Sequence, residues 1–260
     1  MTAWEMVAVS AAGFAAGGIN AVVGSGTLVT FPVLLAVGLP PVTATISNSL
    51  GLVPGNLTGS IGYRRELRGQ RRLLLRLLPA SVLGALTGAF LLLHLPASAF
   101  EAIVPALVGL AVLLVATQPL LQRWVARRRE VGDDADPAPG RGRMVALFAG
   151  AYATGTYGGY FAASQGVLQI GIFGLLLHES LHRLNALKNV LTLGVNTVAA
   201  ATYVVVATDR VHWTAAALVA GGALVGGYAG SSVGRRLPAV VLRTVIVALG
   251  LVAIAVLLTR

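Results

Sequence analysis

Long apolar runs, each about as long as a membrane is thick, constrain this chain more than any other feature. A helix of about 20 residues spans the ~30 Å hydrocarbon core of a bilayer. Two apolar segments, 26–38 and 166–178, are too short for this, since each would give a helix of roughly 20 Å. Eight others are long enough: 4–24, 42–63, 73–94, 99–122, 143–163, 184–208, 213–234 and 238–259. The sequence therefore predicts an all-α integral membrane protein with eight full-length transmembrane helices and two short, broken or re-entrant helices.

The composition supports the same class of protein. Hydrophobic residues make up 56% of the chain and charged residues only 11%, whereas a soluble domain carries about 25% charged residues. The net charge of +10 comes mainly from arginines that gather between the apolar segments. That placement indicates membrane topology and contact with anionic lipid, and it argues against nucleic acid as a partner.

The two halves of the chain resemble each other. Residues 84–90 (GALTGAF) recur as 222–228 (GALVGGY). A shift of 140 residues also pairs Gly26 with Gly166 and lays the two short segments on each other. We therefore predict two homologous repeats: a first transmembrane repeat over 1–122, a charged, Pro/Gly-rich cytoplasmic linker over 123–143 expected to be a loop, and a second transmembrane repeat over 144–260.

The arginines provide a test of how the repeats are oriented. If each short segment crosses the membrane, each half has five crossings, and the basic loops, including the one with Arg235 and Arg236, fall on one side. If the short segments are re-entrant instead, Arg235 and Arg236 move to the other side. The positive-inside rule favours the first arrangement. It predicts inverted repeats in a cell (inner or plasma) membrane, with cytoplasmic basic loops, although whether the short segments cross or turn back stays open.

Glycine-rich breaks precede both short segments. A pair of short, glycine-interrupted apolar segments at matching positions of two halves is typical of a transporter binding site. A helix that starts after such a break presents free N–H groups to an anion. The alternative is that these glycines only permit close helix packing. The candidate site residues at and before the breaks are Asn20, Ser25 and Gly26 in the first half, and Tyr157, Ser164, Gln165 and Gly166 in the second.

The helix after each break is expected to carry a polar stripe. Asn185, Lys188, Asn189, Thr192 and Asn196 fall on one helical face, and Lys188 is the only lysine in the chain. The matching first-half positions include Asn48, Ser49 and Asn56. One ammonium among amides and hydroxyls suits a small oxyanion, which only accepts hydrogen bonds. Alternatively, the Lys188 side chain snorkels to the interface near Arg183.

Other chemistry has weaker support. No carboxylate lies in the middle of an apolar segment, which argues against a pump built on a buried Asp or Glu. His178 and His182 have a metal-binding spacing but no third ligand nearby, so we predict neither a metal site nor a cofactor. Residues 24–26 (GSG) resemble a fragment of an intramembrane serine-protease motif, but such short strings are common in membrane helices. We therefore predict no catalytic residues and no enzyme activity.

Several motifs together resemble a known family. They are GGINAVVGSG at 17–26 leading to Pro32, GLPPVTA at 38–44, GTYGGYF at 155–161 and NALKNV at 185–190. Their arrangement is similar to that of the sulfite exporter TauE/SafE family, also called the toluenesulfonate uptake permease family. The resemblance implies a permease for sulfite or for small organosulfur anions such as sulfonates.

These observations lead to one functional hypothesis. We expect a secondary transporter that moves a small sulfur-containing oxyanion by alternating access around the stripe and the breaks. Its partners would be that anion and the lipid bilayer, and a homodimer is left open. The alternatives are an anion channel or a transporter of another small organic anion, and a membrane enzyme is the least favoured.

Overall fold

All regular structure in the described residues, 1–130, 140–232 and 239–258 of the computed structural model, is helical. The elements are α1 (Ala3–Val22), α2 (Thr27–Ala36), α3 (Pro41–Gly62), α4 (Arg71–His94), α5 (Ala97–Glu130), α6 (Arg141–Tyr160), α7 (Gln165–Leu176), α8 (Leu181–Val206), the 3₁₀ helix η1 (Thr208–Arg210), α9 (Trp213–Ser232) and α10 (Ala239–Leu258). The predicted all-α class is thus confirmed. By length and composition, the five helices α1, α4, α5, α8 and α9 could cross a membrane. The predicted count of eight is not confirmed.

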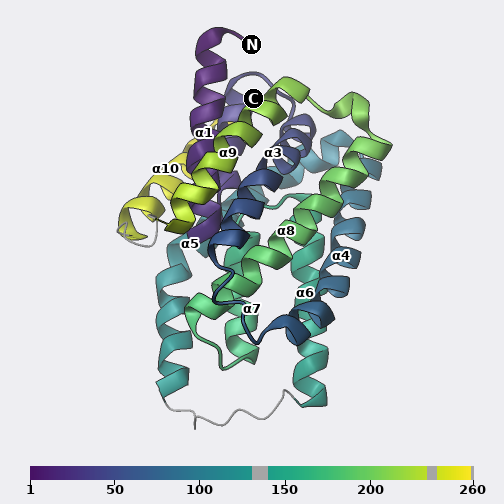
Figure 1. Ribbon diagram of the computed structural model, residues 1–260. Coiled ribbons are helices and arrows are strands. Elements are labelled where there is room, and N and C mark those ends of the chain that lie inside the picture. The colour runs from purple at the N-terminus through teal and green to yellow at the C-terminus, as the bar shows by residue number, and fades with distance from the viewer. Residues whose placement is uncertain (131–139, 233–238, 259–260) are drawn as a thin grey trace.

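The long helices lie side by side in a bundle, with α3 and α8 packed on each other near its centre (Figure 1). Around them, α1 packs on α9, and α6 packs on α4. In the same way α2 contacts α10, and α7 contacts α5. The N-terminal end of α1 lies at the opposite end of the bundle from the C-terminal end of α5 and the N-terminal end of α6 (Figure 1).

Two of these helix crossings depend on glycine. A Cβ on either of two glycines four residues apart would overlap a backbone carbonyl oxygen of the facing helix. The glycines are Gly84 and Gly88 of α4, which face α6, and Gly222 and Gly226 of α9, which face α1. Small residues let helix backbones approach closely, which gives membrane helices much of their packing energy. The recurring sequence at 84–90 and 222–228 therefore builds matched crossings.

Each short helix turns back beside the helix before it. Gly150 of α6 lies against Ile172 of α7, although a continuous helix would hold these residues about 33 Å apart. Gly26, the residue before α2, packs against Ala16 of α1. Of the two possibilities that the sequence left open, these contacts favour short segments that turn back over segments that cross. The reason is local, because Gly24 (φ 87°) and Ser164 (φ 60°) adopt left-handed conformations that end the preceding helical path.

The predicted linker at 123–143 is only partly a loop. Helix α5 continues through its first residues to Glu130, and α6 begins at Arg141. The stretch from Arg123 to Glu130 contains neither glycine nor proline and is rich in arginine, a good helix former. Nothing in it ends the helix, which is why the boundary was predicted too early. Residues 131–139 lie outside the described part of the chain, as do Arg235 and Arg236.

Candidate functional site

The two glycine breaks meet inside the bundle. The backbone N–H of Gly166 donates a hydrogen bond of 3.2 Å to the carbonyl oxygen of Gly24. A Cβ on Gly24 would lie 2.7 Å from the Cα of Gly166, and the reverse distance is also 2.7 Å. Real Cβ atoms do not approach other atoms so closely, so this contact requires glycine at both positions. Two segments 142 residues apart in the chain therefore form one junction.

Lys188 lies across this junction. Its Cδ would be 3.3 Å and 2.8 Å from Cβ atoms placed on Gly24 and Gly166, and its Nζ donates to the carbonyl oxygen of Asn20 at 2.9 Å. The side chain is 1% exposed, so it does not snorkel to the interface. It is also the sole charged side chain that is buried among the described residues. The ammonium thus lies within the bundle, beside both breaks.

The C-terminal end of α1 receives donors from two other helices. Asn189 Nδ2 donates to the carbonyl oxygen of Ala21 at 3.2 Å, and Gln118 Nε2 of α5 donates to that of Val23 at 3.4 Å. The last carbonyls of a helix have no partner within the helix, and a cation is favoured beside them. Lys188 therefore lies at the negative end of α1. Sequence reasoning anticipated helix N-termini at the site and missed this C-terminus.

In the first half, several of the predicted site residues bond to protein groups. Asn48 accepts from the Thr30 hydroxyl and donates to the Thr27 hydroxyl at 3.2 Å. Asn20 accepts from the N–H of Gly26 at 2.7 Å and donates to Asn56 Oδ1 at 3.2 Å. These bonds hold α2 against α1 and α3. The N–H of Gly26, expected to face a ligand, already has a protein acceptor.

In the second half, by contrast, buried polar atoms are left without partners. Gln165 is 1% exposed, and neither its oxygen nor its nitrogen has a hydrogen-bond partner within the described residues. The same holds for Gln169 Nε2, Asn196 Oδ1 and the Tyr157 hydroxyl. Beside the first break, Ser25 Oγ and Asn56 Nδ2 are also unpartnered. An unsatisfied buried polar group costs about 1–3 kcal/mol, so these atoms mark where a polar ligand would be stabilised.

The remaining predicted residues are placed as follows. Ser49 and Thr192 are buried, while Asn185 is half-buried. Ser164 donates to the carbonyl oxygen of Ala111 at 3.1 Å and so ties the second break to α5. Sequence reasoning missed Gln169, although its spacing of four from Gln165 in an apolar segment was a usable signal. No group of three metal-ligating side chains occurs within the described residues.

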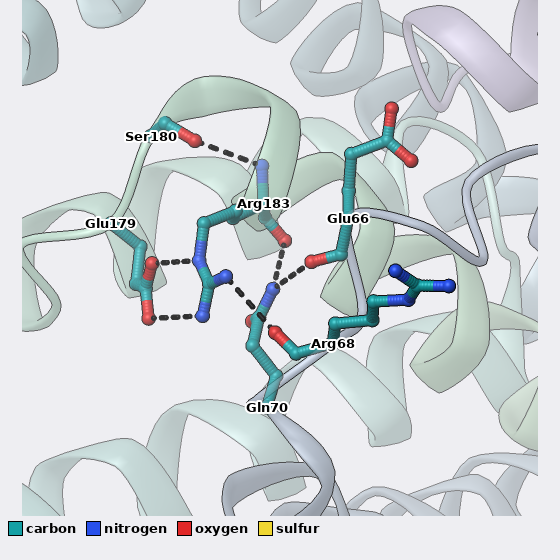
Figure 2. Close-up of polar contacts among 6 residues, drawn as sticks. All are labelled: Glu66, Arg68, Gln70, Glu179, Ser180 and Arg183. Carbon is teal, nitrogen blue, oxygen red and sulfur yellow. Dashed lines mark hydrogen bonds and ion pairs between the residues drawn. The ribbon is translucent and has the colours of Figure 1, made fainter.

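Polar contacts between two loops fix the start of α8 (Figure 2). Arg183 pairs with Glu179 and donates to the carbonyl oxygen of Arg68 at 3.0 Å. Gln70 Nε2 donates to the carbonyl oxygens of Glu66, at 2.8 Å, and Arg183, at 3.2 Å. Ser180 caps the helix by accepting from the backbone N–H of Arg183. The α3–α4 loop of the first half therefore holds the helix that carries Lys188.

Helices α1 and α2 form one helical hairpin broken at its glycines, and α6 and α7 form another. The two broken hairpins meet beside one buried cation. This organisation is typical of a polytopic membrane transporter. The chain belongs to the sulfite exporter TauE/SafE family, whose family model matches residues 9–257. It is therefore a multi-pass membrane protein of a transporter family, as the sequence motifs indicated.

Two curated relatives agree with this class. The chain is 32% identical over 96 residues to a "probable membrane transporter protein" of Haemophilus influenzae. It is 31% identical over 94 residues to the "probable membrane transporter protein ORF9" of a Sinorhizobium species. These matches cover 37% and 36% of this chain, and only 38% and 36% of the relatives. No solved structure matches the chain.

Proposed function

We propose that this protein is a secondary transporter that moves a small sulfur-containing oxyanion, such as sulfite or an organosulfonate, by alternating access. The observation that carries the proposal is the burial of Lys188 at the junction of both breaks. A buried ammonium is costly unless an anion and hydrogen-bond acceptors accompany it. The described structure supplies one carbonyl acceptor, from Asn20, and no buried carboxylate.

The substrate would be held by one charge and several neutral groups. Lys188 supplies the charge, and the unpartnered amides and hydroxyls supply donors to oxyanion oxygens. The proposed donors are Ser25, Asn56, Tyr157 and Gln165, whereas the unpartnered atom of Asn196 is an oxygen, which only accepts. Asn20, Asn48 and Asn189 would position the elements around the site instead of binding the substrate, since each already bonds to the protein near a break. A single cation also favours a singly charged anion, because a second buried negative charge would be uncompensated.

Alternating access fits a two-fold repeat over residues 1–122 and 144–260. The helix contacts support such a repeat, because α1 on α9 matches α6 on α4, and α2 beside α10 matches α7 beside α5. We propose that each half contributes one broken hairpin and three crossing helices. A hairpin enters and leaves the membrane at the same side, so each half crosses the membrane three times. Because three is odd, the second half starts on the opposite side from the first, and the two halves insert in opposite directions. The two hairpins would then rock against each other around Lys188.

The orientation follows from the basic loops. The loop that contains Arg68 contacts Arg183, and the neighbouring ends of α5 and α6 carry Arg123 and Arg141 (Figure 1). By the positive-inside rule this end faces the cytoplasm. The N-terminal end of α1 would then lie outside, in a cell membrane. Each half would then cross the membrane three times instead of five, because a hairpin does not cross. Both numbers are odd, so both arrangements place the basic loops on the same side.

A flux experiment tests the proposal. Purified protein in proteoliposomes is given sulfite, sulfate, thiosulfate, sulfoacetate, taurine and acetate, and the uptake of each is measured. Lys188→Met keeps an unbranched side chain but removes the charge. Losing a buried charge that pairs with the substrate costs about 3–5 kcal/mol, or roughly a 100-fold or greater loss of rate. The matched control is Arg141→Gln, which removes an exposed charge of α6 and should leave uptake unchanged.

The outcomes separate the alternatives. Wild-type transport of a sulfur oxyanion that Lys188→Met abolishes, in a variant that still elutes as a folded protein, supports the proposal. An unchanged rate in Lys188→Met rejects the role of the lysine. Currents that do not saturate with substrate and resolve into single-channel openings would identify an anion channel instead of a carrier.

A further inference from the structure

The inward face of α7 carries a glutamine that is not among the substrate contacts proposed above. Gln169 is 0% exposed. Its Oε1 accepts a hydrogen bond of 3.0 Å from the hydroxyl of Thr192, whereas its Nε2 has no partner within the described residues. A carboxamide whose oxygen is engaged must turn its NH₂ group the other way. Thr192 therefore determines the direction in which Gln169 presents its donors.

Gln169 has polar neighbours on both helices. Gln165 precedes it by one turn of α7, and both polar atoms of the Gln165 carboxamide are unpartnered. A Cβ on Gly158 would lie 2.7 Å from Gln165 Nε2, so glycine leaves space there for this carboxamide. On α8, Asn196 follows Thr192 by one turn and also has an unpartnered oxygen. Because α7 and α8 are in contact, these groups form one buried amide patch.

The amide patch adjoins the buried cation. The residue after Gln165 is Gly166, and the Cδ of Lys188 lies 2.8 Å from a Cβ placed there. The first half has no equivalent of the hydrogen-bonded pair Gln169 and Thr192. A shift of 140 residues places Val29 at the position of Gln169 and Leu52 at that of Thr192. Both are apolar and buried, so the fold does not need a polar pair here, and packing alone does not explain Gln169.

We propose that Gln169 is a substrate-binding donor, oriented by Thr192, in a neutral amide subsite that binds the oxygen atoms of a sulfur oxyanion beside Lys188. This inference rests on the proposed transport function and deepens it. Lys188 would balance the charge of the anion, and this contact alone does not distinguish one anion from another. The carboxamides of Gln165 and Gln169 would donate to separate oxygens of the anion, an arrangement that suits an oxyanion better than a single-atom halide.

Kinetic measurements on four variants test the inference. Sulfite and methanesulfonate are supplied to proteoliposomes, and KM and maximal rate are determined. Gln169→Glu keeps the shape and the bond from Thr192 but replaces a donor with a negative charge. It should raise KM at least about 10-fold, a change that corresponds to about 1.4 kcal/mol. Gln169→Leu should raise KM for both probes and provides a second result if the carboxylate impairs folding.

Two further variants separate orientation from bulk. Thr192→Val removes the hydroxyl that orients Gln169 and should raise KM, whereas Thr192→Ser should restore the wild-type value. Ser81→Ala is the matched control, because Ser81 of α4 is also 0% exposed with an unpartnered hydroxyl but packs against α6. It should leave KM unchanged.

The results distinguish this inference from the transport proposal. If both Gln169 variants keep the wild-type KM while Lys188→Met abolishes uptake, Gln169 is not a substrate contact and the transport proposal stands. If the wild-type protein carries no sulfur oxyanion at all, both ideas fail. A raised KM in Ser81→Ala would show that any buried polar change perturbs transport and would also overturn the inference.

Discussion

The two broken hairpins share a layout but differ in how their polar groups are used. At the first break, Asn20 and Asn48 bond to protein atoms at the start of α2 and in α3, and Ser25 Oγ and Asn56 Nδ2 are left without partners. Beside the second break, Gln165 and Gln169 of α7 keep unpartnered atoms, and the helix that follows supplies Lys188. In a repeated scaffold, one half can therefore use most of its polar groups for structure while the other half supplies the charge and more of the unpartnered groups. The predictions below test that division.

The largest expected effect comes from the contact between the hairpins. Gly24 and Gly38 have almost the same left-handed backbone, with φ of 87° and 88°. A Cβ on Gly24 would meet Gly166, whereas one on Gly38 meets nothing within 4 Å. Gly24→Ala should therefore abolish transport and lower the melting temperature sharply. Gly38→Ala should cost only the backbone strain, about 1 kcal/mol, and should retain transport. Equal effects of the two changes would contradict a tight junction.

The second prediction contrasts Asn48 with Lys188, which occupy matching positions of the two halves. Asn48→Leu leaves the hydroxyls of Thr27 and Thr30 without this partner, and should lower the free energy of unfolding by about 1–3 kcal/mol. Lys188→Met removes a buried charge that has no carboxylate partner, together with its desolvation cost, so it should lower the free energy of unfolding less than Asn48→Leu. Thermal unfolding in detergent measures both. If Lys188→Met is the less stable of the two, the lysine is structural and the proposed division of roles is wrong.

The smallest effect is expected at the loops before α4 and α8. Arg183→Gln breaks the pair with Glu179 and the bond to Arg68 (Figure 2), yet the side chain is only partly buried, so about 1 kcal/mol or less is lost. A looser start of α8 should expose Asn185. Since the chain has no cysteine, Asn185→Cys can report this by thiol labelling, which should accelerate a few-fold in the Arg183→Gln background.

A control and an opposing outcome complete this test. Arg64→Gln removes a neighbouring exposed arginine whose described hydrogen bond is to the carbonyl oxygen of Ile61, close in its own chain segment. It should leave the labelling rate unchanged. Identical labelling in all three backgrounds would show that the Arg183 contacts do not hold α8 in place.

Much of the helical pattern was predictable, because hydropathy and glycine act locally. The apolar segments, the breaks at Gly24–Gly26 and Ser164–Gly166, and the polar face of α8 were all visible in the sequence. The partners of the polar groups were not. Asn48 bonds to Thr27, 21 residues away, and Lys188 bonds to Asn20, 168 residues away. No local pattern specifies such pairs, so Asn48 was predicted as a ligand contact and Gln169 was overlooked.

By itself, the sequence determined that this chain forms apolar helices, where they are interrupted, and that one lysine lies among them, because hydrophobicity and backbone freedom belong to individual residues. The tertiary structure alone decided that α7 turns back beside α6, that Gly24 meets Gly166, and that the Lys188 ammonium lies at the C-terminal end of α1. These features depend on which helices pack together. Packing is a property of the whole bundle, since each buried polar group is satisfied only by atoms brought from distant parts of the chain.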